Sequence, residues 1–314
     1  MVPVSSFPLL RLPNNATIVT LSAMDNLELL GISLASKKTK GLVQSLRIKA
    51  SELIVYIARG GSFSIRLKIP LQFLCIQSFK FYEDVYYHHY SNLLDRRTFI
   101  DHLKFIFNTE KIKVDFGSNS QLFDFEPILK DRRDIESVCL ITDNQEEHRR
   151  ILNIMKPSIV TIHSIFELKE ILFQNVDYLR ARDMIIGLED LLGLNIRNFS
   201  TFCPMVPARV LNRFLKLWTR GSNLQLESLK LHSEVDKDFM IEDIFDRLKT
   251  TQYTTVRYFK SAKGTRKITD GLDISRFDGT MATILLLKLG QLTIDFVFEM
   301  FVWHDHCIAK ETDL

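Results

Sequence analysis

The sequence has few of the residues that mark disulfide-rich or disordered chains. It contains 4 cysteines, 8 prolines and 12 glycines among 314 residues. The cysteines are more than 60 residues apart and form no CxxC pair; they are Cys75, Cys139, Cys203 and Cys307. This spacing predicts buried, reduced thiols and an intracellular protein, cytoplasmic or nuclear. The low proline and glycine content argues against disorder, and the length allows a large core.

The sequence also lacks a charge excess and a long apolar run. Its 41 basic and 38 acidic residues leave a net charge of +3, which is too small and too scattered for a nucleic-acid groove or an anionic membrane surface. The first residues do not form a signal peptide. The most apolar segment, 281–303, is interrupted by Lys288, Gln291, Asp295 and Glu299 and does not reach the roughly 20 residues of a membrane helix. We therefore expect neither nucleic acid nor a membrane as partner.

Motifs of nucleotide-binding and hydrolytic enzymes are missing. No GxGxxG, GxxxxGK[ST] or GxSxG is present. His304 and His306 would share a face on a strand, close to Cys307, so a metal site is conceivable. No fourth ligand can be identified, and a polar exit from a strand is the preferred interpretation. The sequence therefore predicts a non-catalytic protein with no cofactor and no metal.

Three short helices are expected between residues 7 and 46. Pro13 fits the first turn of a helix because its missing N–H costs nothing there. Asp25 or Asn26 can cap a second helix, and Ser36 a third. Three helices in so short a segment form little core, so we expect some of their leucines to need a partner.

Strand patterns follow the helices. Alternation of apolar and polar residues over 62–69 predicts a half-buried strand, with 53–57 as its partner across a turn at Gly60-Gly61. Farther on, strands and helices alternate; the candidate strands are 111–116, 136–141, 158–162, 193–197 and 226–231, and the candidate helices are 95–108, 145–155, 166–173 and 206–219. The first strands start about 25 and 22 residues apart, which is the repeat length of leucine-rich solenoids.

The C-terminal part returns to strands. Asp278-Gly279 and Leu289-Gly290 indicate turns, and the second of them lies between the apolar runs 281–289 and 292–303. We expect a closing antiparallel hairpin with an inner face that includes Phe296, Phe298 and Phe301 or their neighbours. Trp218, in the helix predicted at 206–219, is expected in the core.

Two segments resemble known families. Residues 7–46 are similar to an F-box, with Leu12-Pro13 before the first helix, a Met24-Asp25 junction, and Ser36-Lys37-Lys38 at the third helix. The segments VLNRFLKLWTRGSNLQLESLKL and GLDISRFDGTMATILLL, followed by FVW, resemble the type 2 F-box-associated domain. The order of the two segments agrees with the architecture of that family.

The resemblance implies a substrate receptor of an SCF (Skp–cullin–F-box) ubiquitin ligase. Such a protein binds a Skp-type adaptor, and through it a cullin–RING ligase, while its second domain recruits a target that is unknown here. The adaptor contacts implied by the resemblance are Leu10, Leu12, Pro13, Ile18, Leu21, Leu27, Leu30 and Leu34. Some of these must instead hold the helices together, and the sequence does not sort them. An F-box-like interaction module outside a ligase is the alternative.

Together these observations predict an α+β fold. A three-helix F-box at 5–50 precedes a connecting hairpin segment at 51–91. A type 2 F-box-associated domain at 92–303 then forms an irregular, leucine-rich-repeat-like α/β region closed by C-terminal antiparallel strands.

Overall fold

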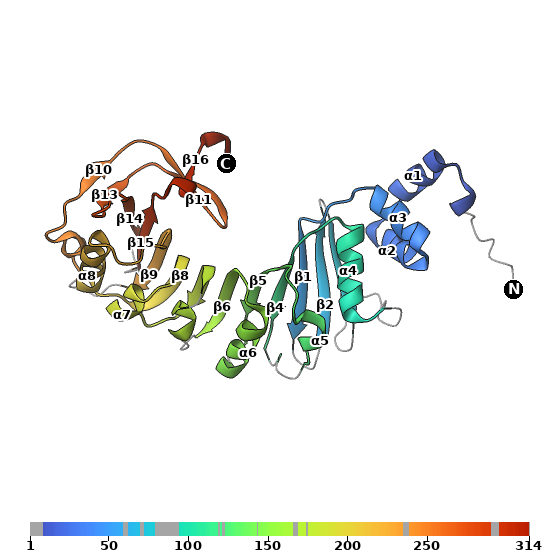
Figure 1. Cartoon of the computed structure of the whole chain (residues 1–314), viewed down its shortest axis with the longest axis horizontal. Coiled ribbons are helices and arrows are strands. Elements are labelled where there is room, and N and C mark those ends of the chain that lie inside the picture. The colour runs from blue at the N-terminus through green and yellow to red at the C-terminus, as the bar shows by residue number, and fades with distance from the viewer. Residues whose placement is uncertain are drawn as a thin grey trace. The chain divides into compact units, whose positions relative to one another are not determined.

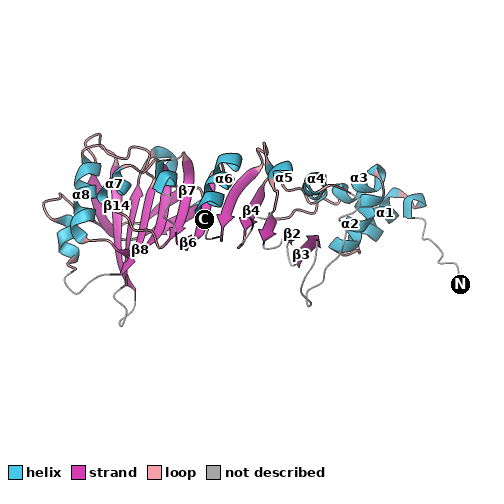
Figure 2. Cartoon of the chain, turned by 90° about the horizontal axis from the view of Figure 1, so that it is seen from below, coloured by secondary structure: helices cyan, strands magenta, loops and turns pink. Residues whose placement is uncertain are grey.

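A computed structural model gives the fold of the chain. It describes residues 9–58, 62–69, 72–78, 94–118, 120, 123–142, 144–165, 169–173, 175–234, 239–289 and 295–313. The chain forms two compact units, residues 1–136 and 137–314, which are described separately (Figure 1). The fold is mixed α and β, as expected (Figure 2).

Unit 1 begins with the three predicted helices. A short 3-10 turn precedes them, and the elements are η1 (Leu9–Arg11), α1 (Asn14–Ser22), α2 (Asn26–Ala35) and α3 (Lys37–Ser45). Pro13 occupies the N-cap position of α1. Asp25 caps α2 and Ser36 caps α3, each in a reciprocal capping box that satisfies backbone N–H groups of the first turn. The predicted caps are therefore confirmed.

A small sheet follows in unit 1. Its elements are β1 (Glu52–Ala58), β2 (Ser62–Ile69), β3 (Gln72–Ser78), α4 (Arg96–Ile106), β4 (Ile112–Phe116) and α5 (Glu126–Leu129). β1 and β2 pair antiparallel, which confirms the predicted hairpin, and the predicted turn at Gly60-Gly61 lies outside the described residues. β1 also pairs with β4 in parallel. Leu53, Val55 and Ile57 of β1 are fully buried, so this strand lies at the centre of the core.

Unit 2 opens with parallel strands that pair in chain order. The elements are β5 (Ile135–Leu140, which begins two residues before the unit boundary), α6 (Gln145–Met155), β6 (Ile159–Ile165), η4 (Lys169–Phe173), β7 (Val176–Arg182), α7 (Leu188–Leu192), β8 (Ile196–Met205), α8 (Ala208–Thr219) and β9 (Ser228–Glu234). Each strand from β5 to β9 pairs with the next one. Figure 1 shows α6 and α7 on the same side of these strands.

Antiparallel strands complete unit 2. They and their connecting turns are η5 (Ile241–Phe245), β10 (Thr251–Tyr253), β11 (Arg257–Ser261), β12 (Gly264–Ile268), β13 (Gly271–Ser275), β14 (Met281–Leu289), β15 (Asp295–Val302), η6 (Asp305–Cys307), β16 (Ile308–Ala309) and η7 (Glu311–Asp313). β15 pairs antiparallel with both β9 and β14, and a separate three-stranded sheet has the order β12-β11-β16.

The predicted C-terminal hairpin is confirmed as β14 and β15. Gly279 has φ +88°, a left-handed conformation that suits glycine in the predicted turn. Gly290, in the other predicted turn, lies outside the described residues. Phe296, Phe298 and Phe301 are all buried, but successive residues of a strand alternate between its faces. Phe301 therefore packs on the face opposite to the other two, so both faces of β15 are covered.

Two predictions in the middle of the chain were wrong in detail. The strand predicted at 193–197 begins only at Ile196 and extends to Met205, and β7 was missed. The segment predicted as a helix at 166–173 is a 3-10 helix over 169–173, and residues 166–168 lie outside the described residues. Trp218 is fully buried on α8, as expected.

The repeat character and the domain bounds stay predictions. The parallel strands of unit 2 start at residues 135, 159, 176, 196 and 228, which is not an even repeat. The compact units meet between residues 136 and 137, whereas the predicted family domains have the bounds 5–50, 51–91 and 92–303. No helix within the described part of the chain is long and apolar enough to span a membrane.

Candidate functional site

The N-terminal helices leave large apolar side chains on the surface. Leu10 is 44% exposed and Ile18 is 43% exposed. Val19, which the sequence analysis did not select, is 70% exposed. α1 carries apolar residues around its whole circumference, so only part of them can face the other helices. That pattern is the sequence signal by which Val19 could have been found.

The eight proposed adaptor contacts fall into three groups. Leu10, Pro13 and Ile18 are exposed, and Leu12, Leu27 and Leu34 are half-buried. Leu21 and Leu30 are fully buried within unit 1 and hold the helices together. The structure thus separates the eight residues by their exposure, which the sequence could not do. Only the first group, Leu10, Pro13 and Ile18, is exposed to solvent.

Hydrogen bonds and a cation–π contact fix these helices to α4 and the residues after it. Ser33 Oγ of α2 lies 2.7 Å from His102 Nε2 in a buried position. Lys40 Nζ of α3 lies over the ring of Phe105, 4.7 Å from its centroid. Asn108 Nδ2 donates to the carbonyl of Ile48 at 3.1 Å. Burial, with a smaller contribution from the charge of Lys40, lowers the pKa of His102 to about 4.

Unit 2 contains a cleft of about 720 Å³. Its walls include Trp303, Met281 and the exposed side chain of Ile308. Trp303 Nε1 donates to Thr283 Oγ1 at 2.8 Å, and the guanidinium of Arg257 lies 5.2 Å from the Trp303 ring centroid. These contacts hold the indole in place, so the cleft offers a fixed aromatic surface.

Two charged groups of the cleft, Arg257 and Asp278, are paired with neighbouring residues. Arg257 Nη2 lies 2.8 Å from Asp273 Oδ2. Asp278 accepts hydrogen bonds from Arg276 and Thr280, which lower its pKa below the ordinary range. Because their charges are compensated, these groups suit recognition of a partner better than proton transfer.

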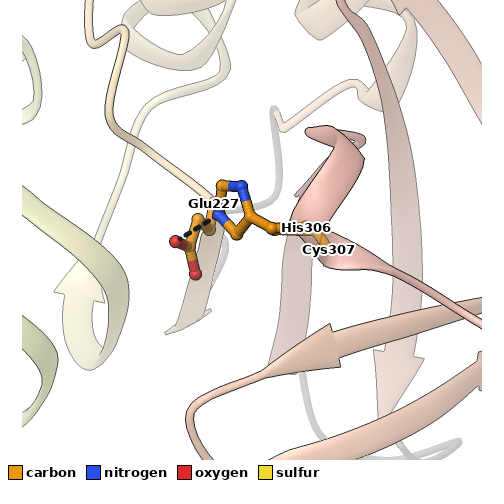
Figure 3. A group of neighbouring side chains, drawn as sticks. All are labelled: Glu227, His306 and Cys307. Atoms are coloured by element: carbon orange, nitrogen blue, oxygen red, sulfur yellow. Dashed lines mark hydrogen bonds and ion pairs between the residues drawn. The ribbon is translucent and has the colours of Figure 1, made fainter.

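A cluster of ligating side chains lies beside this cleft. Glu227, which immediately precedes β9, and His306 and Cys307 of η6 each place one ligating atom within 4.8 Å of the other two. His306 Nε2 donates to Glu227 Oε1 at 2.9 Å, as Figure 3 shows. Burial, and next the charge of Glu227, raise the pKa of the Cys307 thiol to about 12. The ring of His304 stacks on that of His306, with the ring centroids 5.5 Å apart, and its Nε2 donates to the carbonyl of Leu226 at 3.0 Å.

Two of the three residues of this cluster, His306 and Cys307, were already candidates from the sequence. The sequence placed His304 and His306 on one face of a strand; their rings do stack, but His304 precedes and His306 lies within a 3-10 turn rather than a strand. Glu227 was missed because it lies 79 residues from His306 and carries no local motif.

Comparison with known proteins shows which family part of this sequence resembles. Residues 167–231, which include β7, α7, β8, α8 and most of β9, match the model of the F-box-associated family. Residues 167–231 are thus similar to an F-box-associated domain, and the resemblance inferred from the sequence for this part of the chain is confirmed.

One curated relative extends the match to most of the chain. The chain is 25% identical over 301 residues to "F-box associated domain-containing protein sdz-33" of Caenorhabditis elegans, which covers 89% of this chain and 93% of the relative. No solved structure gives a significant match. Neither the family nor the relative is described as an enzyme.

Proposed function

We propose that this chain is the substrate receptor of an SCF-type ubiquitin ligase. The N-terminal helices bind a Skp-type adaptor, and through it a cullin–RING assembly, while the F-box-associated part binds a target protein. Ubiquitin transfer belongs to other subunits of such a ligase, so the receptor itself needs no catalytic group. The site of action is intracellular.

The observation that carries this proposal is the apolar surface of η1 and α1. Leu10, Ile18 and Val19 lie in the segment that resembles an F-box, and each is at least 43% exposed. Exposed apolar side chains gathered in one short segment favour burial against a partner. The fully buried Leu21 and Leu30 hold the helices together and so fix the position of that surface.

The cleft of unit 2 is the proposed target-binding surface. Aromatic side chains are enriched among the residues that dominate protein interfaces, and Trp303 is held in the wall of this cleft by Thr283 and Arg257.

The adaptor interface is tested by placing charge on its exposed surface. An Ile18→Asp, Val19→Asp double variant of the full chain would bury two unpaired carboxylates on adaptor binding. Loss of interface anchors typically costs roughly 2–4 kcal/mol, so the affinity for a purified Skp-type adaptor should fall by about 30- to 1,000-fold. Isothermal titration calorimetry measures this loss.

Ile185→Asp is the matched control. Ile185 is 74% exposed and belongs to unit 2, so a carboxylate placed there should leave adaptor affinity intact. Both variants should keep the wild-type melting temperature, because all three positions are exposed. Wild-type protein that fails to bind the adaptor at micromolar concentration would refute the ligase assignment and favour the alternative, an F-box-like interaction module outside a ligase.

A further inference from the structure

The side-chain cluster at Glu227, His306 and Cys307 has the composition of a zinc site. Thiolate, imidazole and carboxylate are the three protein ligands that Zn²⁺ uses. Zn²⁺ bonds of about 2.0–2.3 Å in a tetrahedron separate the ligand atoms by roughly 3.3–3.6 Å. The three ligating atoms here all lie within 4.8 Å of one another, and His306 Nε2 and Glu227 Oε1 are 2.9 Å apart. Displacements of about 1 Å would complete the geometry.

Glu227 is held rigidly in place. Its backbone N–H donates to the carbonyl of Arg197 at 2.7 Å, and its own carbonyl accepts from the N–H of Val302 at 2.8 Å. The second carboxylate oxygen, Oε2, accepts from Asn198 Nδ2 at 2.8 Å. Oε1 is thereby left to face His306, and Asn198 takes the place of the outer partner that orients metal-bound carboxylates.

Cys307 is held in place by a backbone hydrogen bond and by apolar packing. Its N–H donates to the carbonyl of His304 at 2.8 Å, and its side chain is fully buried in a cluster with Phe259, Ile268 and Phe301. The side chain of His306 is 65% exposed, so an ion can enter from solvent on that side. Two ligands are therefore preorganised, and the third can close over a bound ion.

Charge compensation also favours a divalent cation. The carboxylate of Glu227 is almost fully buried. In the part of the chain that the structure describes, its cationic neighbours are His306 and Arg197, whose Nε lies 4.0 Å away and whose side chain is half-exposed. One Zn²⁺ with one thiolate and one carboxylate is electrically neutral. Such an ion would replace the proton of the thiol and compensate the buried carboxylate together.

We propose that Glu227, His306 and Cys307 bind one Zn²⁺ ion, with water as the fourth ligand. The ion connects η6 to the start of β9, and residues 304, 305 and 308, on either side of the ligands, form a wall of the cleft. Zinc would thus set the position of that wall. This proposal does not depend on adaptor binding. It replaces the interpretation preferred from the sequence alone, in which His304 and His306 form a polar exit from a strand.

Cobalt substitution tests the site in the full chain. Protein dialysed against a chelator is titrated with Co²⁺, which gives a near-ultraviolet charge-transfer band only when a thiolate coordinates it. We expect one equivalent of Co²⁺ to produce this band and Zn²⁺ to displace it. Cys307→Ser should abolish the band, and Asn198→Ala should weaken binding by about 10- to 100-fold through the outer partner. Cys139→Ser, a half-exposed thiol outside the cluster, is the matched control.

His306→Ala keeps the test decisive if Cys307→Ser fails to fold. Because the His306 side chain is 65% exposed, His306→Ala should still fold without metal, with a small fall in melting temperature from the loss of its hydrogen bond to Glu227, while Co²⁺ affinity falls at least 10-fold. A wild-type titration without the charge-transfer band would overturn the proposal, because surface histidines alone bind Co²⁺ without it. Equal affinity of wild type and His306→Ala would overturn it as well.

Discussion

Glu299 allows a quantitative test of how unit 2 is held together. Its carboxylate is 1% exposed and lies on β15 between two cations. Arg266 of β12 donates to both oxygens, at 2.9 and 2.6 Å, and Lys230 Nζ of β9 lies 2.6 Å from Oε1. Burial opposes the charged form, but the hydrogen bonds and charges of the two cations outweigh it and lower the pKa of Glu299. The cluster joins the three-stranded sheet to the main sheet of the unit.

Replacing the carboxylate of this cluster should cost less stability than replacing its two cations. Arg266 and Lys230 are more than one-third exposed, so each can turn to solvent when Glu299 is replaced. Glu299→Gln should therefore cost about 1–3 kcal/mol, the usual cost of lost charged hydrogen bonds. An Arg266→Met, Lys230→Met double variant leaves the carboxylate buried and unpaired, and should cost about 3–5 kcal/mol.

The pH dependence gives the sharper result. In the wild type the folded pKa of Glu299 is below its unfolded value, so its stabilisation is lost as pH falls through the folded pKa. In the double variant only burial acts, the folded pKa is raised, and stability should increase as pH falls through it. Urea unfolding from pH 7 to pH 3, relative to Glu299→Gln, measures both slopes, because the wild-type loss begins only near the unfolded value of about 4.5. Slopes of equal sign in wild type and double variant would refute the reasoning.

Two further predictions concern buried side chains. Trp218→Ala should destabilise the protein by roughly 3–5 kcal/mol in thermal unfolding, because it empties a fully buried site; Trp218→Phe should cost less, because the buried indole N–H has no hydrogen-bond partner to lose. A Trp218→Ala variant that keeps its melting temperature but loses a bound target would make Trp218 a recognition residue. The folded pKa of His102, about 4, lies below its unfolded value of about 6.5, so the free energy of unfolding should fall by about 3 kcal/mol between pH 6.5 and 4. His102→Gln should remove that part of the slope in urea titrations, and an unchanged slope would contradict the burial of this imidazole.

Local interactions made much of the fold predictable. Asp25 and Ser36 cap helices through hydrogen bonds to residues two or three positions away, so the sequence alone contains the signal. The hairpin of β1 and β2 follows from alternation that a half-buried strand requires. Such features depend on few residues that are near one another in the chain.

Other features depend on partners distant in sequence. β7 contains Asp177, Arg180 and Arg182 among few buried residues, so it lacks an apolar pattern and is a strand because β6 and β8 pair with it. β8 buries Asn198, whose amide is satisfied by Glu227, 29 residues later. For the same reason the sequence could not separate Leu21 and Leu30 from the exposed Ile18: helix packing decides their exposure.

The attachment of the N-terminal helices to α4 limits how the protein can be divided. The N–H of Ala50 donates to the carbonyl of Phe107 at 2.9 Å, and Ser33 contacts His102. A fragment that ends near residue 50 would expose the face of α2 and α3 that covers α4. It would then bind other proteins nonspecifically through that face, whether or not they are adaptors. A fragment for adaptor studies should therefore include the whole of unit 1, residues 1–136, so that the N-terminal helices keep their contacts with α4.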